Sequence, residues 1–215
     1  MTTSLAWGVV EPVEYQGWAD RYDADTRRFG WCAPQRVLDV LRRTEISAAR
    51  ILDLGVGTGQ CSRPLLDAGA SVVGIDAASA MLEQVAAHGY EALHEAKLGD
   101  VSLGSVVGPA PFDAMVSAGV LHFVPDLDGL LADVAMLLRP GGVACFTTIP
   151  PQARGFSDAT HVRPREAVES GLAAAGLTLR EAERFVAYYA DGDREQPVEY
   201  EVFSAVRAAV PSRPS

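Results

Sequence analysis

The amino-acid sequence predicts an α/β fold: a doubly wound, mostly parallel seven-stranded sheet with an antiparallel C-terminal hairpin and an N-terminal helical lid. Short apolar runs alternate with stretches of helical periodicity between residues 49 and 148, as in β-α-β units. A glycine-rich turn follows the first of these runs. Two longer apolar runs, separated by a short polar stretch, close the chain and are typical of a hairpin at a sheet edge.

The first five strands are expected at residues 50–54, 71–75, 91–94, 112–117 and 143–148. Between them, residues 80–87 form an expected helix that residues 76–79 can cap and that Gly89 ends, because glycine tolerates positive φ. A second helix is expected at residues 127–138, where leucine and valine recur at helical spacing. The Arg-Pro-Gly-Gly run at residues 139–142 is expected to break this helix in a turn.

The C-terminal part continues the pattern. Residues 164–175 read as an amphipathic helix that Gly176 ends. Strands are then expected at residues 177–190 and 198–207, around a turn at residues 191–193. These two strands are the predicted antiparallel hairpin.

The N-terminal part is helical and aromatic-rich, and its stretch at residues 7–41 contains all three tryptophans. The sequence has no internal repeat and no linker. We therefore expect one domain at residues 1–210, made of a lid segment at 1–45 and a sheet core at 49–210. The remaining residues, 211–215, are expected to form a flexible tail.

The charge balance limits the partners of the chain. Of its 215 residues, 28 are acidic and 18 basic, which gives a net charge of −10. This charge repels a phosphate backbone or an anionic membrane, so we expect neither nucleic acid nor a membrane as a partner. No window approaches the roughly 18 uninterrupted apolar residues of a membrane span. The cysteines Cys32, Cys61 and Cys145 form no C-x-x-C pair, which favours a reducing, cytoplasmic location without structural zinc.

The scarcity of lysine and the absence of asparagine argue against several enzyme classes. Lys97 is the only lysine, and asparagine does not occur. No phosphate-binding Gly-Lys-Ser/Thr run is therefore present, and no tyrosine stands four positions before Lys97 to make a dehydrogenase pair. ATPase, kinase and short-chain dehydrogenase activities are disfavoured.

The stretch Arg-Ile-Leu-Asp-Leu-Gly-Val-Gly-Thr-Gly at residues 50–59 carries the most information. Glycines are needed where the backbone turns sharply or where a ligand must touch main chain. The dinucleotide fingerprint would require glycine where this chain has Gln60, and the carboxylate of Asp53 repels phosphate but suits an ammonium or sulfonium group. Asp76 ends the next expected strand, where it can accept hydrogen bonds from ribose hydroxyls.

Four segments together resemble a known family. They are Ile-Leu-Asp-Leu-Gly-Val-Gly-Thr-Gly, Val-Val-Gly-Ile-Asp with Met81 five residues on, Phe-Asp-Ala-Met-Val-Ser-Ala-Gly-Val-Leu-His, and Leu-Leu-Arg-Pro-Gly-Gly. In this order they resemble the class I S-adenosylmethionine-dependent methyltransferases, which have a Rossmann-like fold. The resemblance covers residues 15–207 and is greatest to the small-molecule branch typified by enzymes of ubiquinone and menaquinone biosynthesis. Val56 departs from the small residue usual in that branch but contributes mainly backbone.

The resemblance implies a site for S-adenosyl-L-methionine and its product S-adenosyl-L-homocysteine. Asp53, Gly55, Val56 and Gly57 would surround the methionine part, and Ser117 would offer its carbonyl to the ammonium group. Around the adenosine, the implied residues are Asp76 on the ribose, Ala77 and Met81 beside the adenine, and Ala96 and Lys97 at its edge, although the usual Gly-Asp pair is missing there. Tyr22 and Trp31 would cover the methionine carboxylate.

Several of these residues have an equally simple structural interpretation. Met81 can be core filler, Tyr22 and Trp31 can bury an N-terminal helix, and Lys97 can be an ordinary solvated lysine.

The reaction implied is methyl transfer to a small-molecule acceptor, without a metal. The sulfonium methyl is already activated, so the protein mainly positions the acceptor and excludes water. If the acceptor is a hydroxyl, His122 is the candidate general base, with His161 as a second candidate for substrate contact. Two alternatives stay open: a protein that binds the cofactor without methyl transfer, as a cyclase or regulatory module, and a dinucleotide oxidoreductase, which Gln60 disfavours.

Overall fold

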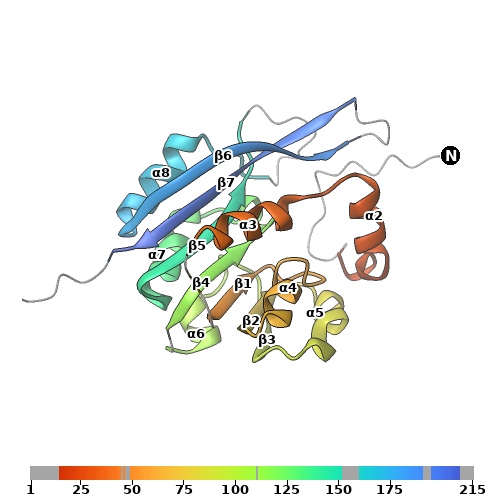
Figure 1. Cartoon of the computed structure of the whole chain (residues 1–215), viewed down its shortest axis with the longest axis horizontal. Helices are drawn as coiled ribbons and strands as arrows, with labels where there is room; N and C mark the ends of the chain where they lie inside the picture. The colour runs from red at the N-terminus through yellow and green to blue at the C-terminus, as the bar shows by residue number, and fades with distance from the viewer. Residues whose placement is uncertain are drawn as a thin grey trace, which may run out of the picture.

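A seven-stranded sheet organises the chain, with strand order β3-β2-β1-β4-β5-β7-β6 (Figure 1). The computed structural model describes residues 15–44, 46, 49–109, 111–151, 160–190 and 195–208. Neighbours pair in parallel from β3 to β5, whereas β7 is antiparallel to both β5 and β6. The strands are β1 (Arg50–Leu54), β2 (Ser71–Asp76), β3 (Ala92–Glu95), β4 (Phe112–Ser117), β5 (Leu138–Thr148), β6 (Leu177–Tyr189) and β7 (Pro197–Arg207).

Helices cover both faces of the sheet because the central strands are apolar on both sides. α3 (Ala33–Arg42) and α4 (Ser62–Asp67) contribute to one core cluster with β1, β5 and β7. α6 (Leu103–Val107), α7 (Leu127–Leu137) and α8 (Arg165–Ala174) close the larger cluster on the other face. α5 (Ser79–Val85), followed by η2 (Ala86–His88), packs on β2 and β3.

The predicted fold class and hairpin are confirmed, and most predicted ends lie within one or two residues of the observed ones. Gly89 and Gly176 have φ of 79° and 75°, as expected of residues that end helices. Asp126 caps α7 by accepting a hydrogen bond from the Gly129 N–H at 2.9 Å. The predicted turn at 191–193 and the predicted tail at 211–215 lie outside the described residues.

The Arg-Pro-Gly-Gly run at residues 139–142 differs from its prediction, because it lies inside β5. Phe112 pairs with Leu138 before the run, and Ala114 pairs with Val143 after it. The extra residues are absorbed as an irregularity in the β4–β5 register, where Gly141 has a φ of 79°. The run is therefore a bulged start of the strand rather than a turn outside it.

The described part of the N-terminal segment consists of two parts with different positions in the fold. α3 has Pro34 near its start and buries Val37, Leu38 and Leu41 against the sheet, so it belongs to the core. Ahead of it, η1 (Ala19–Arg21) and α2 (Tyr22–Arg28) lie at the side of the sheet, toward the ends of β1 and β2 (Figure 1). Only this earlier part is placed to cover a site at the strand ends.

Strand order directs the site to one edge of the sheet. The chain runs outward from β1 through β2 to β3, then returns to the other side of β1 with β4. Loops leaving the carboxyl ends of β1 and β4 therefore diverge and leave a crevice, which is where open α/β sheets bind ligands.

Candidate cofactor and substrate site

The glycine loop after β1 forms the floor of the crevice. The N–H groups of Gly55 and Val56 both donate to the Ile75 carbonyl, at 2.8 and 3.0 Å, which ties the loop to β2. Gly55 has a φ of +74°, and a Cβ there would collide with Val120, so no other residue fits without movement. Gly57 has a φ of +51°, and the nearest atom to an added Cβ is 3.9 Å away. Its backbone is thus open to a ligand.

Asp76 stands at the tip of β2 and braces this loop. Its Oδ2 accepts a hydrogen bond from the Gly57 N–H at 2.8 Å, and its Oδ1 accepts one from the Ala78 N–H at 2.9 Å. Burial raises the pKa of Asp76, although the backbone N–H groups of Ala78, Gly57 and Ala77 act in the opposite direction. The carboxylate lines the cavity, so it can accept further hydrogen bonds from a ligand's hydroxyl groups.

Asp53 is the most unusual group of the site. The side chain is 1% exposed, and its Oδ2 has no hydrogen-bond partner in the part of the chain that the structure describes. Burial raises its pKa to about 7, partly offset by a hydrogen bond from Ser62, while Asp76 raises it further. Buried carboxylate oxygens nearly always have a partner, so this atom indicates a missing donor or cation.

Asp53 lies beside a small cavity that is also lined by Gly55, Val56, Gly57, Tyr22 and Trp31. This cavity has a volume of about 30 Å³. It shares four lining residues with a larger cavity: Tyr22, Gly55, Gly57 and Ala118. The carboxylate of Asp53 gives this small cavity an acidic wall.

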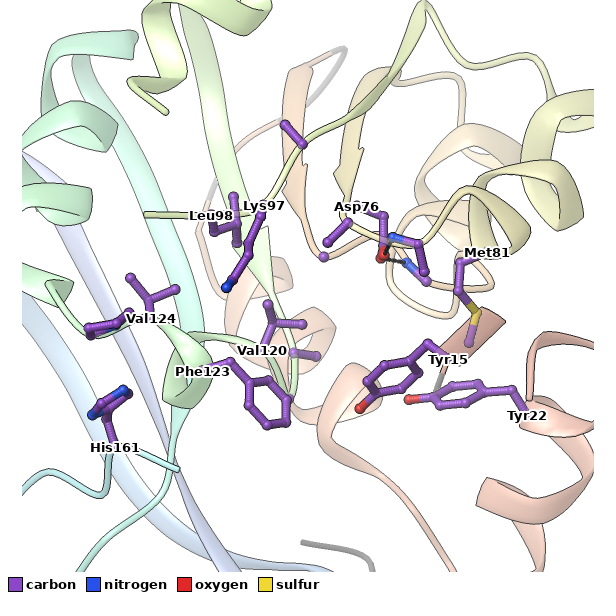
Figure 2. A pocket seen from close by; sticks show the side chains of 18 residues that line it. Tyr15, Tyr22, Asp76, Met81, Lys97, Leu98, Val120, Phe123, Val124 and His161 are labelled. Carbon is purple, nitrogen blue, oxygen red and sulfur yellow. Dashed lines mark hydrogen bonds between the residues drawn. The ribbon is translucent and has the colours of Figure 1, made fainter. Parts of the chain in front are cut away.

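The larger cavity has a volume of about 290 Å³ and extends along the ends of β2, β3 and β4. Figure 2 shows Asp76, Met81 and Tyr22 at one end, Lys97, Val120 and Phe123 in the middle, and Val124 and His161 at the other end. Among the predicted residues, those that line it are Tyr22, Gly55, Gly57, Asp76, Ala77, Met81, Ala96 and Lys97.

Aromatic side chains of the N-terminal segment lie at the Asp76 end of the larger cavity. Tyr15 and Tyr22 lie with their ring centroids 6.2 Å apart, and Trp18 meets Tyr22 edge-on at 4.9 Å. Met81 is 1% exposed and packs in a cluster with Ala19 and Ala78 while still contributing to the cavity wall. The structural and ligand-binding interpretations of Met81 therefore describe the same side chain.

The lid helix is attached to the glycine loop through Asp23. Its Oδ1 accepts hydrogen bonds from the Thr58 hydroxyl at 2.5 Å and from the Gln60 amide at 2.8 Å. The same Gln60 amide also donates to the Thr26 hydroxyl at 3.2 Å. Gln60, which the sequence distinguishes only as a missing glycine, thus holds the lid helix together with Thr58.

The structure places two predicted residues behind the cavity wall. Ser117 is fully buried, and its hydroxyl donates to the Leu54 carbonyl at 2.8 Å, whereas the adjoining Ala118 lines the cavity. His122 is 3% exposed and packs edge-on against Tyr200, with ring centroids 5.8 Å apart. Burial, Arg163 and His161 lower the pKa of His122 to about 3.

These findings argue against the general-base role expected for His122. η3 (Leu121–Phe123) turns its ring toward the hairpin, so that Phe123, and not His122, faces the cavity. His161, the second candidate, does line the cavity, and its N–H donates to the His122 carbonyl at 2.7 Å. The lining residues that sequence reasoning missed include Tyr15, Leu98, Val120, Phe123, Val124 and Pro125. Four of these six follow β4 in the chain, Val120 inside the motif segment and the other three directly after it, a position that could have indicated them.

The described residues contain no group of three or more histidines, cysteines, aspartates or glutamates placed to hold a metal ion. None of their helices has the length and apolar character needed to cross a membrane.

Comparison with known proteins agrees with this geometry. Residues 52–144 match a family model described as a methyltransferase domain. The ubiquinone biosynthesis O-methyltransferase of Xylella fastidiosa (strain 9a5c) is 34% identical over 118 residues, which are 54% of this chain and 48% of the relative. The chain thus spans about half the length of the curated relatives it matches.

Solved structures with the same fold differ in what they do. The Burkholderia thailandensis 1,6-didemethyltoxoflavin-N1-methyltransferase, with 1,6-didemethyltoxoflavin and S-adenosylhomocysteine bound, is 21% identical with a TM-score of 0.64 over 93% of this chain and 92% of its own. The [4+2]-cyclase SpnF is 15% identical with a TM-score of 0.70 over 94% and 98%. At these identities the likeness concerns the fold alone.

The order of the motifs, the glycine cradle and the domain match agree. Residues 52–144 thus match a methyltransferase domain, and the chain has the fold of solved S-adenosylmethionine-dependent methyltransferases.

Proposed function

We propose that this chain transfers a methyl group from S-adenosylmethionine to a small-molecule acceptor. The observation that carries the proposal is the buried Oδ2 of Asp53 beside the glycine cradle, which no described residue satisfies with a hydrogen bond. A buried carboxylate oxygen in this position suits an ammonium group and repels the phosphates of a dinucleotide.

Each end of the cofactor would meet its own set of residues. Asp53 would hold the ammonium group, with the Ser117 carbonyl as a second acceptor, while Tyr22 and Trp31 cover the carboxylate. Asp76 would accept from the ribose hydroxyls, because its carboxylate lines the larger cavity. The adenine would lie among Ala77, Met81 and Ala96, with the Lys97 main chain at its edge.

When bound, the cofactor supplies a methyl group on a sulfonium, which an acceptor displaces in line. The chain then has to hold the acceptor at about 3 to 3.5 Å from that methyl group and keep water away. Gly119 lies where the two cavities approach each other, and an added Cβ there would meet the Trp31 ring at 2.7 Å. This packing would help to keep water away from the methionine end. We propose no general base for the reaction.

Calorimetric titration with S-adenosylhomocysteine and with NAD tests the cofactor assignment. We expect micromolar binding of the first and none of the second, and the reverse result would overturn the proposal. The alternative is that the chain binds the cofactor without transferring a methyl group. The fold does not exclude this alternative, because a [4+2]-cyclase has the same fold. Formation of S-adenosylhomocysteine during incubation with a panel of phenols, amines and thiols separates transfer from binding.

The predicted cellular location and the predicted partners of the chain also remain proposals. Cys61 and Cys145 are buried free thiols, which supports the proposal of a reducing compartment such as the cytoplasm. The acidic net charge supports a partner other than nucleic acid.

A further inference from the structure

The end of the larger cavity that lies away from Asp76 is built differently from the cofactor end. Its wall is apolar, from Leu98, Phe123 and Val124, and two basic side chains stand on either side of that wall. Figure 2 shows the Lys97 ammonium directed toward the middle of the cavity and the His161 ring below Val124. The main chain at Lys97 serves the adenine edge in the proposed site, but its side chain extends past that position.

The Lys97 ammonium is only weakly compensated. Its ion pair with Asp100 measures 4.0 Å, and the two side chains are 54% and 65% exposed. Exposed pairs at such distances contribute little, so the ammonium can exchange Asp100 for a ligand at small cost. The Lys97 side chain is about half exposed. An anion bound to it can therefore keep part of its own hydration shell.

Arg163 adds a second positive charge behind the same wall. Its guanidinium donates to the Val124 carbonyl at 2.5 Å and the Pro125 carbonyl at 2.9 Å, and also to the His161 carbonyl at 3.0 Å. These partners are neutral, and the acids near the start of α7 act on the guanidinium only through space. The hydrogen bonds also fix the positions of Val124 and His161 relative to each other.

We infer that this end of the cavity binds an anionic group, a carboxylate or phenolate, carried by an otherwise apolar acceptor. The inference rests on the proposed function, since it concerns the acceptor of that same site. Apolar walls accommodate the body of such a molecule, and Lys97 with His161 recognises its charged group. A chain with a net charge of −10 repels anions at long range, so an anionic substrate requires local positive groups of this kind.

The single lysine makes a direct experiment possible. Chain saturated with S-adenosylhomocysteine is titrated with 2-naphthoate and 4-hydroxybenzoate, each compared with its uncharged primary amide. Mild acetylation followed by peptide mass spectrometry then reports the reactivity of Lys97 alone, because the N-terminal amine lies in another peptide. We expect the acids to bind about three- to fivefold more tightly than the amides and to slow acetylation of Lys97.

Substitutions separate a local contact from the general field of the protein. Lys97→Met should remove the preference for acids, and Lys97→Arg should keep it. Arg180→Met is the matched control, because it removes the same charge from an exposed position on β6, beside a different cleft. It should leave the preference unchanged.

Three results would overturn the inference: equal binding of acid and amide, a preference that survives in a Lys97→Met/His161→Gln variant, or no binding of either acid. In each of these cases an intact affinity for S-adenosylhomocysteine would leave the proposed function standing. Failure to bind S-adenosylhomocysteine would instead overturn the proposed function.

Discussion

Ionisation of Asp53 should control cofactor affinity around neutral pH. In the cofactor-free chain its pKa is about 7, so below that pH the carboxyl is mostly protonated and offers an ammonium group no charge. A bound ammonium favours the carboxylate and therefore lowers this pKa. Affinity must then fall as the pH decreases through 7, and binding below that pH must release a proton.

The magnitude follows from the ionised fraction. With a pKa of about 7, roughly one tenth of the chains are ionised at pH 6 and roughly nine tenths at pH 8. The dissociation constant for S-adenosylhomocysteine should thus be about tenfold larger at pH 6, which corresponds to about 1.4 kcal/mol. Nearly one proton should be released per ligand at pH 6, and close to none at pH 8.

Calorimetry in two buffers of different ionisation enthalpy measures both quantities. Asp53→Asn is the control, since it keeps the shape of the side chain but cannot ionise, and its weaker affinity should not vary over this pH range. A native chain whose affinity is constant from pH 6 to 8, or an Asp53→Asn variant with the same pH dependence, would refute the reasoning.

Three further predictions concern residues around this site. Asp76→Ala should weaken cofactor binding by about 1.5 to 3 kcal/mol by calorimetry, and an unchanged affinity would mean that Asp76 only braces the glycine loop. His122→Ala should lower the free energy of unfolding by about 2 kcal/mol or more in urea titration, with kcat within about tenfold of normal; a general base would instead lose ~10² to 10⁴ in rate. Asp23→Ala should speed amide hydrogen exchange in residues 15–31 and weaken cofactor binding several-fold, and unchanged exchange there would contradict the attachment of the lid.

The fold could be predicted largely because its signals are local. β1 and β4 have the predicted bounds, since each is a short apolar run between polar or glycine residues. β5 begins five residues before its predicted start, because the rule that proline and glycine end an element ignores pairing with a neighbour. Leu138 pairs with Phe112 in spite of the glycines, and the bulge absorbs the extra residues.

The site was predictable where a motif fixes the backbone, and less so where a side chain can turn either way. Position after β4 placed His122 near the cavity, but the turn of η3 directs its ring to Tyr200, a contact between residues 78 positions apart. Gln60 likewise has its partners on the lid helix, more than 30 positions earlier in the chain. Contacts of this range depend on how elements dock, which periodicity does not encode.

The attachment of the lid to the glycine loop has a kinetic consequence. Tyr22, Trp31 and Pro34 line the small cavity beside Asp53, so a methionine moiety held there is covered by the segment that Asp23 fastens. The residues joined by the Asp23 hydrogen bonds do not line the end of the larger cavity at His161. If the proposed function holds, we expect the methyl donor to bind before the acceptor and the demethylated donor to leave last. Steady-state turnover would then follow the rate at which the Asp23 hydrogen bonds open, and added product would compete with the donor rather than with the acceptor.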